Sequence, residues 1–426
     1  MIVHYNTAVV MTGASLLGAL AGLVGAFAVL RKRSLTGDAL SHAALPGVCC
    51  AYLVIGQRSL PVFLVGALAS GVLGIIIINL LTSRTRIRAD AAIGSVLGVF
   101  FGVGIALSKR ISQLPGGGSR AGLDSFLFGK AASMTLGDVV WISVIAAACL
   151  VIILLLYKQF KLISFDTDFG HTLGWPVRWL DLGLMSLLAI TVVIGLPAVG
   201  VVLTAAMVII PGAAARFWTD RFGRMLALST LFGLAMGFTG TLLSAYNRAL
   251  PAGPTIVLSG AVIFLISLLG GWRRGVIARY LQSRRFETEI SRRRLLEALW
   301  ELQQKNRSVP VSLHSADVQN LQVWKPSCLN AALIAAFQAG ELTRAARGFQ
   351  LSPRGEAAAV EITRTHRLWK ELLQEHPEQA AAIADLTAPL AEQVQPELIA
   401  RMRERLQLRS EWPQLPSDIR PRENQP

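Results

Sequence analysis

No glutamate occurs in this chain before Glu287, and acidic residues of either kind are rare in its first two thirds. Only 16% of the 426 residues are charged, 53% are hydrophobic and the mean hydropathy is +0.51, which excludes an ordinary soluble protein. Residues 1–272 contain 18 Lys or Arg and eight Asp, whereas residues 273–426 contain 23 basic and 18 acidic residues. We therefore predict a membrane region and a region of soluble character, joined near residue 272.

Catalytic chemistry is also missing. The chain has no Gly-x-x-x-x-Gly-Lys-Ser/Thr phosphate loop, because Gly129 and Lys130 are followed by Ala131, which lacks the hydroxyl that holds magnesium. ATP hydrolysis must therefore come from another polypeptide. The soluble region shows no nucleophile with a plausible base, so we do not expect an enzyme. The four cysteines lack metal-site spacing and are interpreted as packing residues. They are Cys49, Cys50, Cys149 and Cys328.

Eight apolar runs approach or exceed the roughly 20 residues that a helix needs to cross the hydrocarbon core. They lie at about 8–30, 39–56, 60–82, 90–108, 136–157, 181–211, 225–246 and 254–272. The first has no Lys or Arg before it, unlike a secretory signal, so we predict an uncleaved span. The sixth has Gly195, Pro197 and Gly200 at its middle, which predicts one broken helix or two short crossings. This pattern predicts an all-α polytopic membrane bundle of eight or nine spans.

Basic clusters predict the orientation, because Lys and Arg are retained on the cytoplasmic side. The densest clusters are Arg31–Arg33, Arg84–Arg88, Lys158–Lys161, Arg216–Arg224 and Arg273–Arg285. All five share one side if the amino terminus is outside and the sixth run counts as two crossings; Lys109, Arg110 and Arg120 then lie outside. We expect a cytoplasmic carboxyl terminus. Glycines at four-residue spacing (18 and 22; 94, 98 and 102; 233 and 237) predict closely packed helices.

The segment Leu35–Gly47, which reads LTGDALSHAALPG, contains the most informative pair of residues. Asp38 and His42 are four residues apart, which places a carboxylate and an imidazole on one helix face. Carboxylate oxygen with imidazole nitrogen suits manganese, iron and zinc, and ionisable residues inside a membrane usually line an aqueous path. The spacing also fits a simpler interpretation, in which Asp38 caps the helix and His42 is a packed histidine.

The segment GDALSHAALPG resembles the signature of the zinc/manganese/iron family of ABC transporter permeases, and the similarity extends through most of residues 8–272. Further similar blocks are Arg88–Leu107, Leu123–Gly129, Ala198–Trp218 and Leu250–Gly260. The resemblance implies a permease subunit of a bacterial inner-membrane importer, in which Asp38 and His42 contact the travelling metal. It implies three protein partners: a cytoplasmic ATP-binding subunit, a second permease chain and an extracytoplasmic metal-binding protein. We expect no permanently bound cofactor, and we favour manganese over zinc or iron.

The block around Pro211–Arg224 resembles the cytoplasmic loop by which such permeases dock on their ATPase. We expect Pro211 and Gly212 to break the span and residues 213–219 to form a short helix at the membrane surface. Arg216, Arg221 and Arg224 would then offer charges to the partner. The same sequence also fits a basic loop that only obeys the orientation rule.

Beyond the membrane region we predict a basic juxtamembrane linker (273–286) that lies against anionic lipid, a soluble domain (287–408) and a loose tail (409–426). The soluble domain resembles, more distantly, metal-dependent repressors of the diphtheria toxin repressor type. The resemblance implies a cytoplasmic winged helix, with a helix from Pro326 in the DNA major groove. Phosphates would meet Arg344, Arg347 and Arg354.

Departures from the repressor pattern favour a retained fold used for dimer contacts or docking over working DNA recognition. The family pairs a His with a Glu four residues later, but here His366 is followed at that spacing by Lys370. Downstream, the segment Asp385–Gln393 keeps only Glu392 as an obvious ligand type. Two other functions stay open from sequence alone: a membrane-anchored, metal-linked transcription regulator and an ion-coupled secondary transporter.

Overall fold

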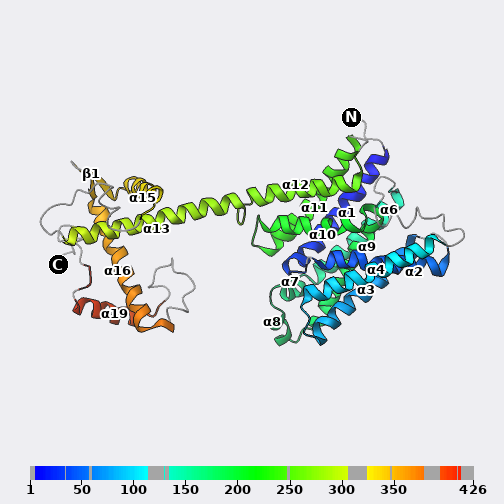
Figure 1. The fold of residues 1–426 in the computed structure, drawn as a ribbon, viewed down its shortest axis with the longest axis horizontal. Helices are drawn as coiled ribbons and strands as arrows, with labels where there is room; N and C mark the ends of the chain where they lie inside the picture. Colours follow the sequence, from blue (N-terminus) through cyan, green and yellow to red (C-terminus); the bar gives the residue numbers. More distant parts are fainter. Residues whose placement is uncertain are drawn as a thin grey trace. The chain divides into compact units, whose positions relative to one another are not determined.

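The structure is a computed structural model in which two compact units, residues 1–279 and 280–426, are described separately as the amino-terminal and the carboxyl-terminal unit (Figure 1). The residues that it describes are 5–33, 35–56, 60–113, 129, 134–246, 250–305, 324–345, 348–378, 394–409 and 411–413. The described helices cover each span predicted from the sequence.

The amino-terminal unit is a bundle of helices (Figure 1). Its helices are α1 (Tyr5–Leu30), α2 (Leu35–Ile55), α3 (Leu60–Arg84), α4 (Ala89–Ser112), α6 (Leu136–Leu155), α7 (Tyr157–Phe165), α8 (Thr167–Thr172), α9 (Val177–Val199), α10 (Val201–Arg216), α11 (Phe222–Tyr246) and α12 (Ala252–Gly270). Eight of these described helices are long and apolar enough to cross a membrane, namely α1, α2, α3, α4, α6, α9, α11 and α12. The predicted polytopic helical bundle is thereby confirmed.

The sixth apolar run is broken at Gly200, which joins α9 to α10. Gly200 has a φ of 92°, a left-handed conformation that side chains with a Cβ rarely adopt. α10 has 16 residues and a length of about 24 Å, shorter than the hydrocarbon core. Pro211 lies inside α10 and Pro197 inside α9, and both helices continue through them. The expected break at Pro211 and Gly212 is therefore wrong, because the glycine with positive φ interrupts the run earlier.

Helix α1 is the packing centre of the amino-terminal unit, in contact with α6, α9, α10 and α11. Its backbone meets α11 at glycine: a Cβ on Gly18 would lie 2.1 Å from the Gly233 carbonyl oxygen. One turn along, the Ser229 hydroxyl donates to the Gly22 carbonyl oxygen at 2.5 Å. Here the predicted close approach of small residues is confirmed. In α4 it is not: a Cβ on Gly94, Gly98 or Gly102 would meet no described atom within 4 Å.

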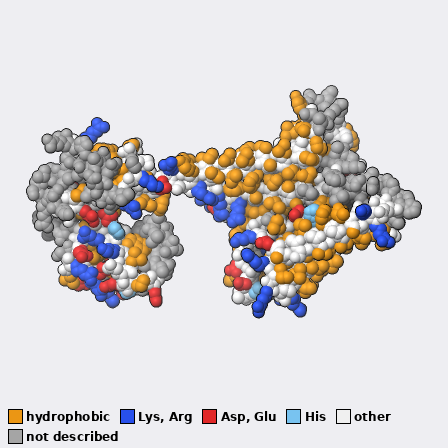
Figure 2. Space-filling view, in the orientation of Figure 1, with side chains coloured by type: hydrophobic (Ala, Val, Ile, Leu, Met, Phe, Trp, Pro, Cys, Tyr) orange, Lys and Arg blue, Asp and Glu red, His pale blue; other side chains and the backbone are white. Residues whose placement is uncertain are grey.

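The helix ends that carry three of the five basic clusters lie close to one another. Arg31 and Arg33, after α1, both pair with Asp181 near the start of α9. The ring of Phe27 packs against Phe160, at 6.0 Å between centroids, and against Phe222, at 5.3 Å. These contacts join the turn after α1 to the clusters at 158–161 and 216–224. Hydrophobic side chains cover much of the face of this unit that Figure 2 shows.

The carboxyl-terminal unit contains most of α13 (Val276–Lys305), which begins in the amino-terminal unit. Its other elements are α15 (Pro326–Gln338), β1 (Leu342–Ala345), β2 (Gly348–Leu351), α16 (Pro353–Glu375) and α19 (Pro396–Leu408). β1 and β2 pair antiparallel, with Leu342 opposite Leu351. The helix expected from Pro326 is α15. The hairpin of β1 and β2 lies between α15 and α16, and the winged-helix assignment stays a prediction.

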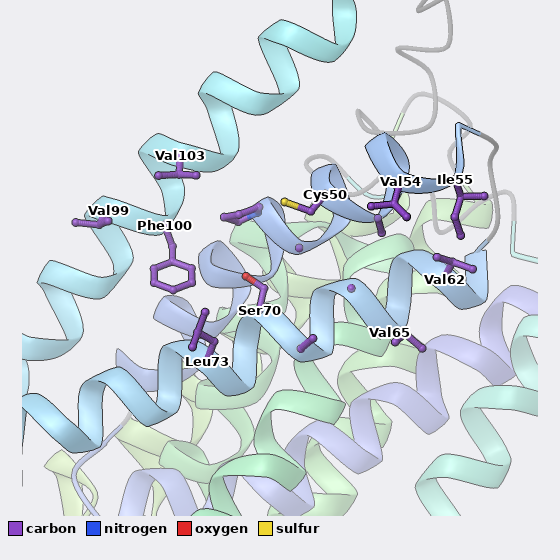
Figure 3. Close-up of a pocket in the computed structure, with 15 residues that line it drawn as sticks. Cys50, Val54, Ile55, Val62, Val65, Ser70, Leu73, Val99, Phe100 and Val103 are labelled. Atoms are coloured by element: carbon purple, nitrogen blue, oxygen red, sulfur yellow. The ribbon is translucent and has the colours of Figure 1, made fainter.

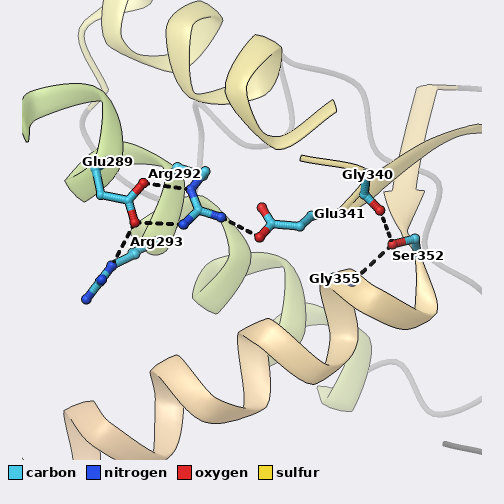
Figure 4. Close-up of polar contacts among 7 residues, drawn as sticks. All are labelled: Glu289, Arg292, Arg293, Gly340, Glu341, Ser352 and Gly355. Atoms are coloured by element: carbon cyan, nitrogen blue, oxygen red, sulfur yellow. Dashed lines mark hydrogen bonds and ion pairs between the residues drawn. The ribbon is translucent and has the colours of Figure 1, made fainter. Parts of the chain in front are cut away.

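Paired charges accompany the small core of this unit (Figure 4). Leu295 and Leu299 of α13 pack with Leu329 of α15 and Phe349 of β2. Arg292 pairs with Glu289, at 2.7 Å, and with the buried Glu341, so one guanidinium joins α13 to the residue before β1. The Ser352 hydroxyl accepts from the Gly355 amide at 3.0 Å and caps α16. Buried ionisable groups in this unit therefore have structural partners.

Candidate functional site

Asp38 and His42 lie on one face of α2, as the spacing predicted. Asp38 is in the first turn of α2, where the helix dipole favours a negative charge. The His42 Nε2 atom is 3.5 Å from Asp38 Oδ1. The Asp38 side chain is 36% exposed and that of His42 is 13% exposed. A carboxylate oxygen and an imidazole nitrogen thus face the same small space, with the carboxylate the more accessible of the two.

The imidazole of His42 is held by packing. Its ring meets the ring of Phe101, from α4, edge to face at 4.7 Å between centroids. The His42 Nδ1 atom is buried and has no hydrogen-bond partner in the structure. Pro46, four residues on, has no N–H, so the usual helical hydrogen bond to the His42 carbonyl oxygen cannot form. Packing against Phe101 therefore orients the imidazole. The His42 carbonyl oxygen, close to the pair, lacks its usual helical donor.

The pair is incomplete as a metal site within the described residues. No group of three or more His, Cys, Asp or Glu side chains that could hold a metal ion is found among them. Metals of this class take four to six donors. Two donors from one helix fit a transient contact, or one half of a site that another chain completes.

A groove lies farther along the same face of α2, between α2, α3 and α4 (Figure 3). Its volume is about 590 Å³ and its lining is almost entirely apolar, with Val54, Val65 and Val103 among the residues. Ser70 is one of the few polar residues there, and its hydroxyl donates to the Ala43 carbonyl oxygen. An apolar groove offers few donors to a metal, so Asp38 and His42 remain the predicted metal contact.

The residues expected to dock the ATPase divide into buried and exposed sets. Pro211 and Gly212 are buried inside α10, where a Cβ on Gly212 would lie 3.1 Å from Ala26 Cα. Gly212 therefore packs against α1, and neither residue is exposed to a partner. Arg216, Arg221 and Arg224 are exposed at the end of α10 and around the start of α11. Only the arginines remain as predicted docking residues.

The basic residues expected near DNA are also placed. Arg344 on β1 and Arg354 at the start of α16 are exposed, and Arg347 lies outside the described residues. α15, the helix expected in the major groove, contains no Lys or Arg. Its exposed side chains include Ile334 and Phe337. A DNA-reading helix needs polar contacts to base edges, which this surface does not favour.

The repressor-type histidine has a partner that the sequence did not indicate. His366 Nδ1 lies 2.5 Å from Glu297 Oε1, which joins α16 to α13. Glu371 is buried and its Oε2 atom is 3.4 Å from Arg409. Phe101 and Glu297 were both missed as neighbours of the two histidines. Each comes from a distant segment, and no local spacing could identify it.

Comparisons with known proteins match more than half of the chain. The profile of the ABC 3 transport family matches residues 4–271. The manganese transport system membrane protein of Bacillus subtilis (strain 168) is 45% identical over 303 residues, which are 71% of this chain and 69% of that protein. The zinc transport system membrane protein of Treponema pallidum (strain Nichols) is 39% identical over 281 residues, 66% of this chain and 94% of that protein.

An iron relative and a solved structure extend the comparison. The chelated iron transport system membrane protein of Yersinia pestis is 33% identical over 252 residues, 59% of this chain and 81% of that protein. The solved structure of PsaBC from Streptococcus pneumoniae in complex with Fab has 33% sequence identity and a TM-score of 0.57, and the match covers 66% of this chain and 95% of that chain. The family match, residues 4–271, spans the helical bundle that carries Asp38 and His42.

Proposed function

This chain belongs to the ABC 3 transport family, and we propose that it is the membrane-spanning permease subunit of an importer that carries a divalent transition metal, most of all manganese. ATP hydrolysis is the work of a separate chain. The observation that carries the proposal is the Asp38–His42 pair on α2, inside a family-matched bundle that otherwise contains few acidic residues. Manganese is favoured because a carboxylate oxygen and an imidazole nitrogen suit it, and because the manganese relative is 45% identical.

A second permease chain would complete the metal contact. The pair supplies two donors, and a facing copy of α2 would bring two more, giving two carboxylates and two imidazoles. The exposed glycines 94, 98 and 102 of α4 support this pairing, because their spacing suits close helix packing and no described residue occupies their face. Phe101 of α4 touches His42, so a chain seated on α4 would lie near the metal contact.

The basic end of the bundle is proposed to face the cytoplasm and to receive the ATP-binding subunit. Contacts among Phe27, Phe160 and Phe222 bring three basic clusters together, and positive charge is retained on the cytoplasmic side. The exposed Arg216, Arg221 and Arg224 would contact the subunit. With an external amino terminus, and with α9 and α10 counted as two crossings, the chain lies in the bacterial inner membrane and its carboxyl-terminal unit is cytoplasmic. An extracytoplasmic metal-binding protein would deliver the ion at the opposite face.

For the carboxyl-terminal unit we propose a docking or dimer contact in place of DNA recognition. The uncharged α15, with Ile334 and Phe337 exposed, supports a protein partner. His366 and Glu371 support the same conclusion, because each already faces a charged partner within the unit. A winged-helix fold without a working metal sensor is consistent with these contacts.

Uptake measurements test the proposed function. A strain without this gene is expected to lose high-affinity uptake of labelled manganese, and the parental chain is expected to restore it. Zinc and iron uptake measured in the same strain rank the three metals. If no divalent transition metal depends on the chain for uptake, while its ATP-binding subunit is present, the proposal is wrong.

A further inference from the structure

The segment that follows α12 is bonded to the loop between α10 and α11. The backbone amides of Arg273 and Arg274 both donate to the Phe217 carbonyl oxygen, each at 3.2 Å. The Arg274 guanidinium reaches the Asp220 carboxylate through Nε, at 3.0 Å, and through a terminal nitrogen, at 2.8 Å. Arg273 Nε lies 3.9 Å from the same carboxylate. The Phe217 carbonyl oxygen and the Asp220 carboxylate of the loop therefore bind Arg273 and Arg274. These two residues begin the carboxyl-terminal extension, the part of the chain after Trp272.

We name this contact the loop clasp (Phe217, Asp220, Gly271, Arg273 and Arg274). In the loop clasp, the backbone at Gly271 lies close to Phe217. A Cβ on Gly271 would lie 2.6 Å from Phe217 Cβ and 2.8 Å from the Phe217 oxygen, so only glycine allows this approach. The ring of Phe217 also packs on Phe264 of α12, at 5.7 Å between centroids. The loop and the end of α12 therefore form one packed corner.

The loop clasp lies between the proposed docking residues and the start of α13. Asp220 lies between the exposed Arg216 and Arg221, the residues proposed to dock the ATP-binding subunit. Only Gly275 separates Arg274 from Val276, where α13 begins and leads toward the carboxyl-terminal unit. The loop and the start of α13 are thus joined through Asp220 and Arg274.

The ionic part of the clasp is weak enough to be broken. The side chains of Asp220 and Arg274 are each 47% exposed, and exposed ion pairs contribute little and are screened by salt. The two backbone hydrogen bonds and the glycine contact do not depend on charge. Substitution of either charged residue therefore removes the ion pair while the backbone contact stays in place.

We propose that Asp220 and Arg274 are positioning residues that couple the ATPase-docking loop to the start of α13. Binding of the ATP-binding subunit at the loop changes the orientation and mobility of the first turn of α13. In the other direction, a change in the orientation of α13 alters the affinity of the loop for the subunit. Such coupling between two positions is reciprocal by thermodynamic linkage. The inference rests on the proposed docking role of the loop, and it gives the carboxyl-terminal extension a route to influence transport.

A double-mutant cycle on the full-length chain tests the coupling. The affinity of the ATP-binding subunit for the chain in lipid nanodiscs is measured for Asp220→Asn, Arg274→Gln and the double variant. Each single substitution is expected to weaken binding about two- to fivefold, the size of an exposed ion pair. The double variant is expected to be no weaker than either single variant. Arg279→Gln, a nearby arginine on α13 without an ion pair to any described residue, serves as the matched control and leaves the affinity unchanged.

A probe on α13 supplies a readout that a purely structural role would not move. In a chain with its native cysteines replaced, a nitroxide at Val276→Cys is expected to change mobility when the ATP-binding subunit is added. The change is expected to disappear in Asp220→Asn. Additive losses in the cycle, or a mobility change that survives Asp220→Asn, would overturn the inference.

The outcome also separates this inference from the proposed docking role. If Arg221→Gln weakens binding of the subunit while Asp220→Asn and Arg274→Gln do not, the docking loop stands and the clasp has no coupling role. If Arg216→Gln, Arg221→Gln and Arg224→Gln all leave binding unchanged, the docking role itself fails, and the inference fails with it.

Discussion

Ionisable side chains serve different purposes in the two units of this chain. In the amino-terminal unit they are scarce, and Asp38 and His42 stand together without a third ligand among the described residues. In the carboxyl-terminal unit they are abundant and paired, as in the contacts of Arg292 with Glu289 and Glu341. A charge inside a membrane bundle is costly and is kept for function, whereas in a small soluble fold it can hold elements together. The difference teaches that His366 and His42 are not equivalent, although both face a carboxylate.

The largest effect is expected where helix backbones touch in the amino-terminal unit. Gly18→Val places a side chain against the Gly233 carbonyl oxygen and is expected to lower the free energy of unfolding by about 3 kcal/mol. A Cβ on Gly98 of α4 meets no described atom within 4 Å, and Gly98→Val is expected to leave the free energy of unfolding unchanged. Unfolding of both variants by detergent titration, with size-exclusion profiles, measures the contrast. Equal destabilisation would mean that α4 is packed as closely as α1.

The paired charges of the carboxyl-terminal unit give the next effect. Arg292→Ala leaves the buried Glu341 without its guanidinium and is expected to destabilise the unit by about 3 kcal/mol. Arg293→Ala removes only an exposed contact with Glu289 and is expected to cost less than about 1 kcal/mol. Hydrogen exchange of α13 and α15 amides in the full-length chain reports both. Similar exchange in the two variants would contradict the structural role assigned to Arg292.

A smaller effect is expected from pH. Hydrogen bonds from Arg292, opposed by desolvation and reinforced by Arg293, lower the pKa of Glu289 to about 2 from its ordinary value of 4.5. Since the folded-state pKa is depressed, the stabilisation is present above about pH 4.5 and is lost as the pH falls toward 2. Because Glu289 is 41% exposed, the change is expected to stay below about 1 kcal/mol. Glu289→Gln should flatten this part of the stability profile, and an unchanged profile would show that the pair contributes nothing.

The smallest expected effect is metal binding by the carboxyl-terminal unit. His366 already faces Glu297, and Lys370 brings a positive charge one turn along α16. The segment Asp385–Gln393, which keeps only Glu392 as an obvious ligand type, lies outside the described residues. Calorimetry of the full-length Asp38→Asn chain is expected to show no manganese or iron binding at micromolar affinity. Micromolar binding that is lost in His366→Ala would show that His366 also binds metal, and the distinction drawn between His366 and His42 would be wrong.

Sequence alone predicted the features that depend on neighbouring residues. The spans followed from apolar runs, and the shared face of Asp38 and His42 followed from four-residue spacing. The break in the sixth run was predicted at its middle, and the structure has it at Gly200. The further break expected at Pro211 and Gly212 is absent, because proline is tolerated in buried membrane helices. Contacts between distant segments were missed. Asp220 and Arg274, 54 residues apart, carry no local signal of their pairing.

The most direct measurement of the central claim is manganese uptake by Asp38→Asn and His42→Ala at equal expression. Each variant is expected to lower the uptake rate at least about tenfold, because each loses one of the two metal donors. Helix α2 and the ATPase-docking loop between α10 and α11 are expected to stay intact. Asp90→Asn, an acidic residue in the first turn of α4, and His171→Ala on α8 serve as matched controls and are expected to transport at the parental rate. Parental transport by both Asp38→Asn and His42→Ala would contradict the account and would leave the pair as a helix cap and a packed histidine.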